Sequence, residues 1–339
     1  MAGTCARMAL LLLLYCFSSF ALASPLKSGK VRPLVIWHGL GDSHSSPGML
    51  EFMSMIKDVH PGIFVHSVYI DKELDNDRKA GFMGNVDIQI DFVADQLASI
   101  PELENGFDAI GFSQGGQFLR AYVERYNAPP VNNLITFGSQ HMGISDVPLC
   151  GRFDVFCQIA RRAARSGTVY GEWAQTNIVQ VRPNTFRDPK RYETYLGANH
   201  FLTSINNERP GERNATYARN FATLNKLVLV LFTEDSTVVP KESAWFGSEA
   251  IPENASPRHT GSWSVGQAPD GSQEVIVQHL SEDREIIPMR LQPLYTGDWI
   301  GLKQLDKRGD VVLESCVGEH MQLGDCWKPL VEKFAGGSL

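Results

Sequence analysis

The 339-residue chain has little cysteine, no excess of positive charge and no low-complexity segment. Its 31 Lys and Arg against 38 Asp and Glu give a formal net charge of −7. No Lys/Arg-rich run interrupts this balance, so the electrostatic footprint of a nucleic-acid-binding protein is missing. With 43% hydrophobic and 20% charged residues, the composition is typical of a globular protein with a substantial core.

The few cysteines form no C-x-x-C pattern. A zinc site is one interpretation, but neither cysteine nor histidine spacing matches a usual zinc site, and the sequence predicts no metal ion and no cofactor. Two of the six cysteines lie in the first 23 residues. The other four allow three connectivities, and in an oxidising compartment we favour the local pairs Cys150 with Cys157 and Cys316 with Cys326.

Only one long apolar run is present, at residues 8–20, and an Ala-Leu-Ala motif follows it. This pattern predicts a secretory signal peptide, residues 1–23. A membrane anchor is the alternative, but the run is shorter than the ~20 apolar residues that a span needs. The mature chain, residues 24–339, is therefore expected to be luminal or extracellular, without a membrane span. N-glycosylation acceptors at Asn214 and Asn254 fit that location.

Apolar runs and helical patterns alternate along the mature chain. Runs typical of buried parallel strands stand at residues 33–37, 62–70, 109–110, 133–137 and 227–232. Helical patterns stand at residues 49–57, 87–100 and 327–334, and directly after residue 113. Alternation of this kind predicts an α/β fold, a mainly parallel sheet with helices on both faces.

Two segments interrupt the alternation, and we expect them to be cap insertions in a single domain, at about 144–224 and 248–300. The first lacks a clear strand and predicts a largely helical insertion; a separate domain is the alternative, but no linker flanks it. The second begins with a Ser/Pro/Gly-rich loop and a hairpin near residues 274–278. Residues 302–313 suggest two strands around a turn, ending in the last core strand.

The motif G-F-S-Q-G at residues 111–115 follows one of the strand patterns and precedes a helical one. That context is typical of a nucleophile elbow, in which a sharp turn lifts the serine hydroxyl above the sheet edge. The alternative is a glycine-rich strand-to-helix loop with an incidental serine. We interpret Ser113 as a nucleophile.

A serine needs a histidine to accept its proton and a carboxylate to orient the histidine. In α/β-hydrolases the chain order is Ser, acid, His, and the groups follow strands. Asp235 follows the apolar run at residues 227–232, with Glu234 and Asp298 as rivals.

His320 follows the predicted last core strand and precedes a terminal helix. His279 is the rival that is hardest to exclude, whereas His259 lies in the Ser/Pro-rich loop. His141 precedes every plausible acid and is better explained as a structural group. The oxyanion hole should use the backbone amides of Gln114, next to the nucleophile, and of Leu40, in the glycine turn after the first strand.

Several motifs resemble the palmitoyl-protein thioesterase family. They are V-I-W-H-G-L-G-D at 35–42, G-F-S-Q-G-G-Q-F-L-R at 111–120, W-F-G at 245–247 and G-E-H-M-Q-L at 318–323. The resemblance implies an α/β-hydrolase, usually lysosomal, that removes long-chain fatty acyl groups from cysteine thioesters of proteins. S-acylated proteins or peptides would be its substrates.

The family's catalytic triad maps onto Ser113, Asp235 and His320, and its oxyanion amides map onto Leu40 and Gln114. The resemblance also implies a disulfide between Cys150 and Cys157 and a glycan at Asn214. Departures are Ser45 and Ser46, near where vertebrate members carry adjacent cysteines, a longer segment at 248–283, and the added pair of Cys316 and Cys326. These changes leave the triad intact and affect the expected shape of the cap.

Two other functions are compatible with these residues. One is a lipase or carboxylesterase acting on oxyesters, and the other is a non-catalytic binding protein on a hydrolase fold. A lysosomal or vacuolar location, as opposed to secretion, rests on the resemblance alone, and the sequence does not indicate an oligomeric state.

Overall fold

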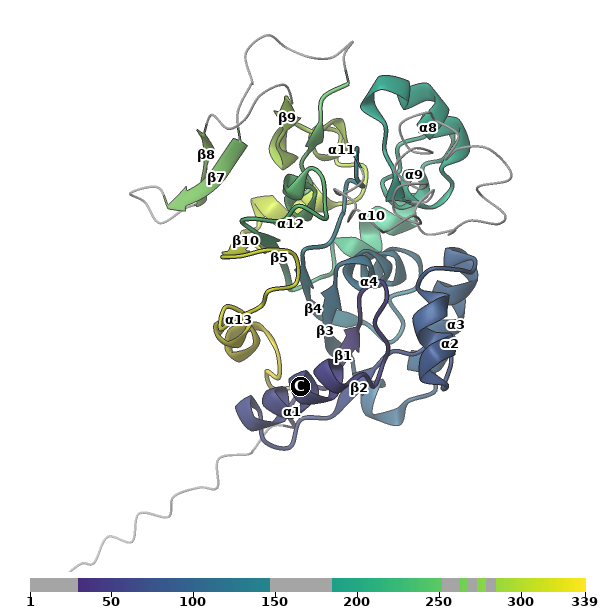
Figure 1. Cartoon of the computed structure of the whole chain (residues 1–339), viewed down its shortest axis with the longest axis vertical. Helices are drawn as coiled ribbons and strands as arrows, with labels where there is room; N and C mark the ends of the chain where they lie inside the picture. The colour runs from purple at the N-terminus through teal and green to yellow at the C-terminus, as the bar shows by residue number, and fades with distance from the viewer. Residues whose placement is uncertain (1–29, 147–184, 252–261, 268–272, 279–284) are drawn as a thin grey trace, which may run out of the picture.

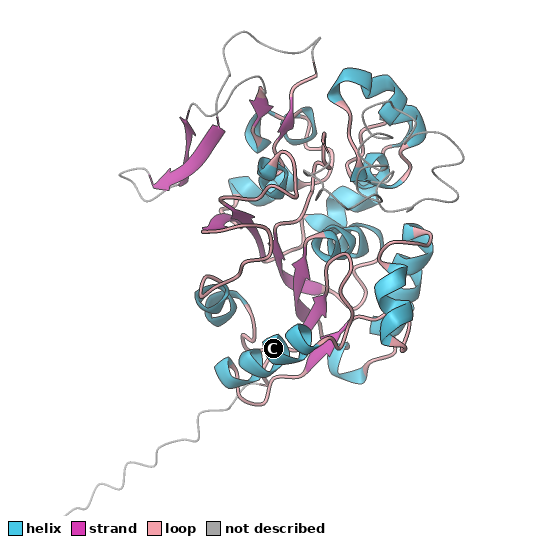
Figure 2. Ribbon diagram, in the orientation of Figure 1, coloured by secondary structure: helices cyan, strands magenta, loops and turns pink. Residues whose placement is uncertain are grey.

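The computed structural model describes residues 30–146, 185–251, 262–267, 273–278 and 285–339. Its centre is a six-stranded sheet in the order β10-β5-β4-β3-β1-β2, and every neighbouring pair is parallel. The strands are β1 (Leu34–Trp37), β2 (Val65–Ser67), β3 (Phe107–Phe112), β4 (Val131–Phe137), β5 (Lys226–Phe232) and β10 (Val311–Cys316). Figure 2 shows these strands in the interior, with helices around them.

Helices cover both faces of the sheet. Those that flank it are α1 (Pro47–Val59), α3 (Val86–Ala98), α4 (Gln114–Arg125), α10 (Ala215–Phe221) and α13 (Trp327–Phe334). Leu34 and Ile36 of β1 pack in one cluster with α1 and α13, whereas Val35 and Trp37 pack in a second cluster with α3 and α4. Successive side chains of a strand point to opposite faces. Since helices cover both faces, all four residues are buried. This arrangement confirms the predicted α/β-hydrolase fold class.

Elements from two segments, residues 185–224 and 248–300, gather at one end of the molecule (Figure 1). From residues 185–224 come η3 (Pro189–Arg191), α8 (Tyr192–Ala198), α9 (Phe201–Ile205) and η4 (Pro210–Glu212) as well as α10. From residues 248–300 come β6 (Ser248–Glu249), β7 (Ser262–Gln267), β8 (Gln273–Gln278), β9 (Ile286–Ile287), η7 (Met289–Leu291) and α11 (Pro293–Thr296). The hairpin of β7 and β8 confirms the one predicted near residues 274–278. That both segments act as caps stays a prediction.

Two predictions of secondary structure were inaccurate, and one helix was missed. The two strands expected at residues 302–313 are a helix, α12 (Leu302–Lys307), followed by β10. The interval of three between the buried Leu302 and Leu305 fits a helix turn, and Gly309 with φ 74° makes the bend into β10. Strand β2 is shorter than residues 62–70. A further helix, α2 (Leu74–Ala80), had no apolar pattern that would predict it.

All six strands point the same way, so their carboxyl ends meet at one edge of the sheet. In open α/β sheets, ligands bind at that edge. The loops that follow β1, β3, β5 and β10 carry the four segments in which the sequence predicted functional residues.

Candidate active site

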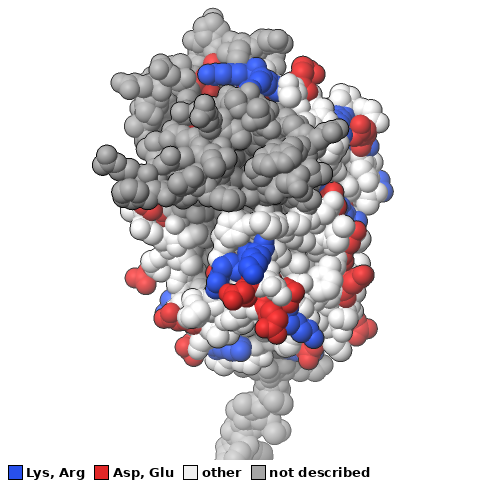
Figure 3. Space-filling view, turned by 45° about the vertical axis from the view of Figure 1, so that its right-hand side comes forward, with Lys and Arg blue, Asp and Glu red and all other residues white. Residues whose placement is uncertain are grey.

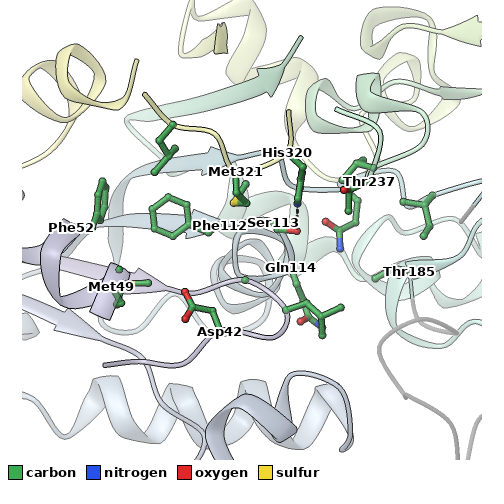
Figure 4. A pocket seen from close by; sticks show the side chains of 17 residues that line it. Asp42, Met49, Phe52, Phe112, Ser113, Gln114, Thr185, Thr237, His320 and Met321 are labelled. Atoms are coloured by element: carbon green, nitrogen blue, oxygen red, sulfur yellow. Dashed lines mark hydrogen bonds between the residues drawn. The ribbon is translucent and has the colours of Figure 1, made fainter. Parts of the chain in front are cut away.

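Ser113 lies in the sharp turn between β3 and α4. Its backbone has φ 49° and ψ −117°, and a conformation of this kind costs a non-glycine residue about 1–3 kcal/mol. The Ser113 N–H donates to the carbonyl oxygen of Phe137 at 2.8 Å, which helps to hold the turn. The side chain is half-buried and lines a cavity (Figure 4). The predicted strand, turn and helix are therefore all present around Ser113.

The glycines near this turn allow α4 to lie close to the sheet. A Cβ atom at Gly111 would stand 2.2 Å from Cα of Gly116, and one at Gly115 would stand 2.3 Å from the carbonyl oxygen of Trp37. Both distances are shorter than van der Waals contact, so any side chain would push the helix away from β1 and β3. Glycine is thus required for the close approach of helix and strand.

His320 connects Ser113 with Asp235. Its Nε2 lies 3.0 Å from Oγ of Ser113, and its Nδ1 lies 2.6 Å from Oδ2 of Asp235. A carboxylate can only accept, so Nδ1 donates to Asp235, and Nε2 is left to accept from the serine hydroxyl. The structure therefore brings together the three residues that chain order predicted, in the geometry that activates a serine.

Asp235 is held in place by the loop that follows β5. Its Oδ1 accepts backbone N–H groups of Thr237 at 2.8 Å and Val238 at 2.9 Å, and its side chain is only 2% exposed. The Oδ2 atom is thereby directed toward His320. A buried carboxylate with three donors stabilises the imidazolium that forms when His320 takes a proton.

The loop that carries His320 is closed by a disulfide between Cys316, the last residue of β10, and Cys326, which precedes α13. The two Cα atoms are 5.6 Å apart and the sequence separation is 10 residues. The loop is also attached to the Asp235 loop, because Glu234 N–H donates to the carbonyl oxygen of Gly318 at 2.9 Å. The predicted pairing of Cys316 with Cys326 is confirmed.

The predicted oxyanion residues Leu40 and Gln114 line the same cavity as Ser113. Gln114 is the first residue of α4, and Leu40 belongs to the turn after β1. That turn lies against the elbow, since a Cβ atom at Gly39 would be 3.4 Å from Cβ of Ser113. The role of the two backbone amides stays a prediction.

The cavity has a volume of about 450 Å3 and is mainly apolar. Its apolar lining comes from Leu40, Met49, Phe52, Phe112, Ile144, Val238, Met321 and Leu323. In Figure 4, Phe52, Phe112 and Met321 form one side of the cavity, and Ser113 with His320 stand at its centre. A small set of polar groups in a mostly apolar hollow is typical of a site for a small apolar ligand.

The sequence analysis missed the contribution of Met49 and Phe52. Both lie on α1, whose helical pattern was recognised, but its position next to the cavity was not inferred. The signal that could have found them is the short connection between the Leu40 turn and α1, which places the first turns of that helix at the carboxyl edge of the sheet.

Other predicted residues have different places. His141 is fully buried, its Nε2 lies 3.0 Å from Oγ1 of Thr136, and burial lowers the pKa of its imidazole, as expected of a structural group. Asp298 accepts from Lys303 N–H at the start of α12. Asn214 is exposed and caps α10. Five further residues lie outside the described part of the chain: Cys150, Cys157, Asn254, His259 and His279.

Within the described residues, no group of three or more His, Cys, Asp or Glu side chains could hold a metal ion. No helix in that same part of the chain is long and apolar enough to cross a membrane. On the face shown in Figure 3, the described surface has basic and acidic side chains interspersed.

Known proteins resemble this chain over most of its length. Palmitoyl-protein thioesterase 1 of Caenorhabditis elegans is 34% identical over 312 residues, which cover 92% of this chain and 93% of that protein. Lysosomal thioesterase PPT2 of Rattus norvegicus is 25% identical and covers 84% of this chain and 80% of its own length. A solved extracellular alpha/beta-hydrolase from a Paenibacillus species has a TM-score of 0.39 at 13% identity, covering 89% of this chain and 96% of that one.

A family model gives the broader grouping. The model described as palmitoyl protein thioesterase matches residues 33–320. This range runs from the start of β1 to His320, and it contains the elbow, the acid loop and the glycine turn. On this match and the C. elegans relative, the chain belongs to the palmitoyl protein thioesterase family.

Proposed function

We propose that this protein hydrolyses thioesters between long-chain fatty acids, palmitate among them, and cysteine side chains of proteins or peptides. The single observation that carries the proposal is the hydrogen-bonded chain of Ser113, His320 and Asp235 at an apolar cavity. Membership of the palmitoyl protein thioesterase family supports the same substrate class.

Acylation begins when Ser113 Oγ attacks the thioester carbonyl carbon and His320 Nε2 takes the hydroxyl proton. The carbonyl oxygen becomes negative and is received by the backbone amides of Leu40 and Gln114. The carbon–sulfur bond then breaks, and His320 returns the proton to the cysteine sulfur. Because a thiolate is a good leaving group, this proton transfer should matter less than it does in amide cleavage.

Deacylation repeats these steps with water as the nucleophile. His320 takes a proton from the water, the hydroxide attacks the acyl carbon on Ser113 Oγ, and the same amides receive the oxyanion. Collapse returns the proton to Ser113 and releases the fatty acid. The apolar side chains of the cavity, among them Phe52 and Phe112, would contact the acyl chain near its carbonyl end.

The proposed location is the lysosome, reached through the secretory pathway. Three features support it: the predicted signal peptide at residues 1–23, the exposed acceptor Asn214 and the disulfide of Cys316 with Cys326. The similar rat protein carries the word lysosomal in its name. Its substrates there would be S-acylated proteins and peptides.

The test compares a palmitoyl thioester with a matched palmitoyl oxyester, using purified protein. The expected result is a clear preference for the thioester and loss of turnover in a folded Ser113→Ala variant. Equal turnover of both esters would favour a lipase or carboxylesterase. If a fluorophosphonate does not label Ser113 in the folded wild-type protein, any assignment as a serine hydrolase would be contradicted.

A further inference from the structure

A carboxylate lies buried beneath the glycine turn, outside the groups that the mechanism uses. Asp77 belongs to α2 and has no exposed surface. Its Oδ2 accepts the backbone N–H of His44 at 2.8 Å and the Nδ1–H of the same residue at 2.9 Å. Its Oδ1 accepts backbone N–H groups of Ile70 at 2.7 Å and Asp71 at 3.3 Å. Asp77 thus joins three segments that are separate in sequence.

His38 adds a fifth group to this cluster. Its Nε2 lies 3.3 Å from Asp77 Oδ2 without forming a hydrogen bond to it. Its Nδ1 lies 3.0 Å from the carbonyl oxygen of Gly39. Burial by itself would raise the pKa of Asp77, but the neighbouring polar groups of His38, His44 and Ile70 hold that pKa well below its usual range. These contacts therefore favour the carboxylate form of Asp77.

The two histidines bracket the segment that contains Leu40. His38 is the last residue before the glycine turn, and His44 lies just after it. The end of helix α2 also lies next to the turn. A Cβ atom at Gly81, which follows α2, would stand 3.6 Å from the backbone nitrogen of Gly41 and 3.6 Å from Cδ1 of Leu40. One end of the turn is therefore hydrogen-bonded to Asp77 through His44, the other end lies against the same carboxylate at His38, and the turn contacts the residue that follows the helix.

We propose that Asp77 is a positioning residue for the oxyanion hole: by holding His44 and packing against His38, it directs the Leu40 backbone amide toward the thioester oxygen. The effect of Asp77 on catalysis rests on the proposed function. The geometric part, that Asp77 holds residues 39–43 in one conformation, stands without it.

The direct variant is Asp77→Asn, which keeps the shape but removes the charge and places an amide N–H2 group among donors. We expect kcat to fall about a hundredfold, the order of loss for one oxyanion donor, with KM little changed, because the amide acts mainly on the transition state. Amide hydrogen exchange across residues 39–43 should become faster.

The matched control is Asp108→Asn. Asp108 is also fully buried and also accepts backbone N–H groups, of Asn133 at 3.1 Å and Gly336 at 3.0 Å. It lies near the start of β3, at the opposite edge of the sheet from Ser113. At conditions of equal folded fraction, this control should keep the wild-type kcat and the wild-type exchange at residues 39–43.

Three outcomes would overturn the inference: equal losses of kcat in the two variants, a loss confined to KM, or unchanged exchange at residues 39–43 in Asp77→Asn. If that variant does not fold, His44→Ala removes one ring donor from a side chain that is 19% exposed, and it should give a smaller loss of kcat with faster exchange. Failure of the proposed function is distinct, since it would appear as an inactive or unlabelled wild-type protein, while the exchange measurement would still decide the role of Asp77.

Discussion

Removal of the Cys316–Cys326 disulfide should lower both stability and turnover. In the chain-entropy treatment, closing a loop lowers the entropy of the unfolded chain by 2.1 + 1.5R ln n cal/mol/K. With the sequence separation of 10 as n, this sum is about 9 cal/mol/K, or about 2.7 kcal/mol at 25 °C. The Cys316→Ala/Cys326→Ala double variant should therefore lose about this free energy of unfolding.

The effect on turnover follows from what the closed loop carries. His320 stands between the two cysteines, and its ring must stay within hydrogen-bond reach of both Ser113 and Asp235. Without the disulfide, the loop keeps the backbone bond from Glu234 to Gly318 but loses its covalent attachment to α13. We expect kcat to fall severalfold, with a smaller change in KM, because the cavity wall supplied by α1 is untouched.

The assay combines urea unfolding with turnover of a palmitoyl thioester, both measured in the absence of reductant. Single Cys316→Ala and Cys326→Ala variants are the controls, because each breaks the same disulfide and should reproduce the loss of stability. Wild-type stability in the double variant would refute the entropy reasoning. Lower stability with an unchanged kcat would refute the claim that the disulfide positions His320.

Three further predictions concern the elbow, the acid and the pH dependence. Asp235→Asn should keep the fold and lower kcat by about 10⁴, as loss of the orienting carboxylate does in serine proteases, and steady-state kinetics would measure it. Gly116→Ala places a Cβ 2.1 Å from Oγ of Ser139 and should lower the free energy of unfolding, measured in urea, by about 1–3 kcal/mol. The control is Gly197→Ala, whose Cβ meets nothing within 4 Å and should be neutral or stabilising in the same assay. Burial raises the pKa of Asp108 to about 6 and of Glu124 to about 8. Both groups therefore contribute most to the free energy of unfolding below about pH 4, and this contribution is lost as the pH rises through those values. The urea midpoint of the wild type should fall between pH 5 and pH 8, and it should fall less steeply in Asp108→Asn and in Glu124→Gln.

The parts of the site that could be predicted from sequence are those with local causes. Ser113 is set by a strand, a glycine turn and a helix that are contiguous in the chain. Asp235 and His320 each follow an apolar strand, and the parallel sheet brings their loops to one edge. The place of His320, after the last core strand and before a terminal helix, then distinguished it from His279 without knowledge of any contact.

Asp77 could not be predicted in this way. It lies in the polar helix LDNDRKA, whose sequence resembles an exposed, charged segment, and its surroundings include His44, 33 positions away. The error at residues 302–313 has a related cause: a segment of seven residues between Gly301 and Gly309 allows either period, and the packing of Leu302 and Leu305 in the core decides for the helix.

The order of the strands along the chain also determines when, during synthesis, Ser113 and His320 can come together. Strand β10 is the last along the chain, and it pairs with β5 at the sheet edge, so His320 reaches Ser113 across 207 residues. At ribosomal rates of about 5–20 residues per second, synthesis of those residues takes roughly 10–40 s. During that interval the nascent chain contains the serine but not the histidine. The hydrogen bond between Ser113 and His320 can therefore form only after the final strand has docked.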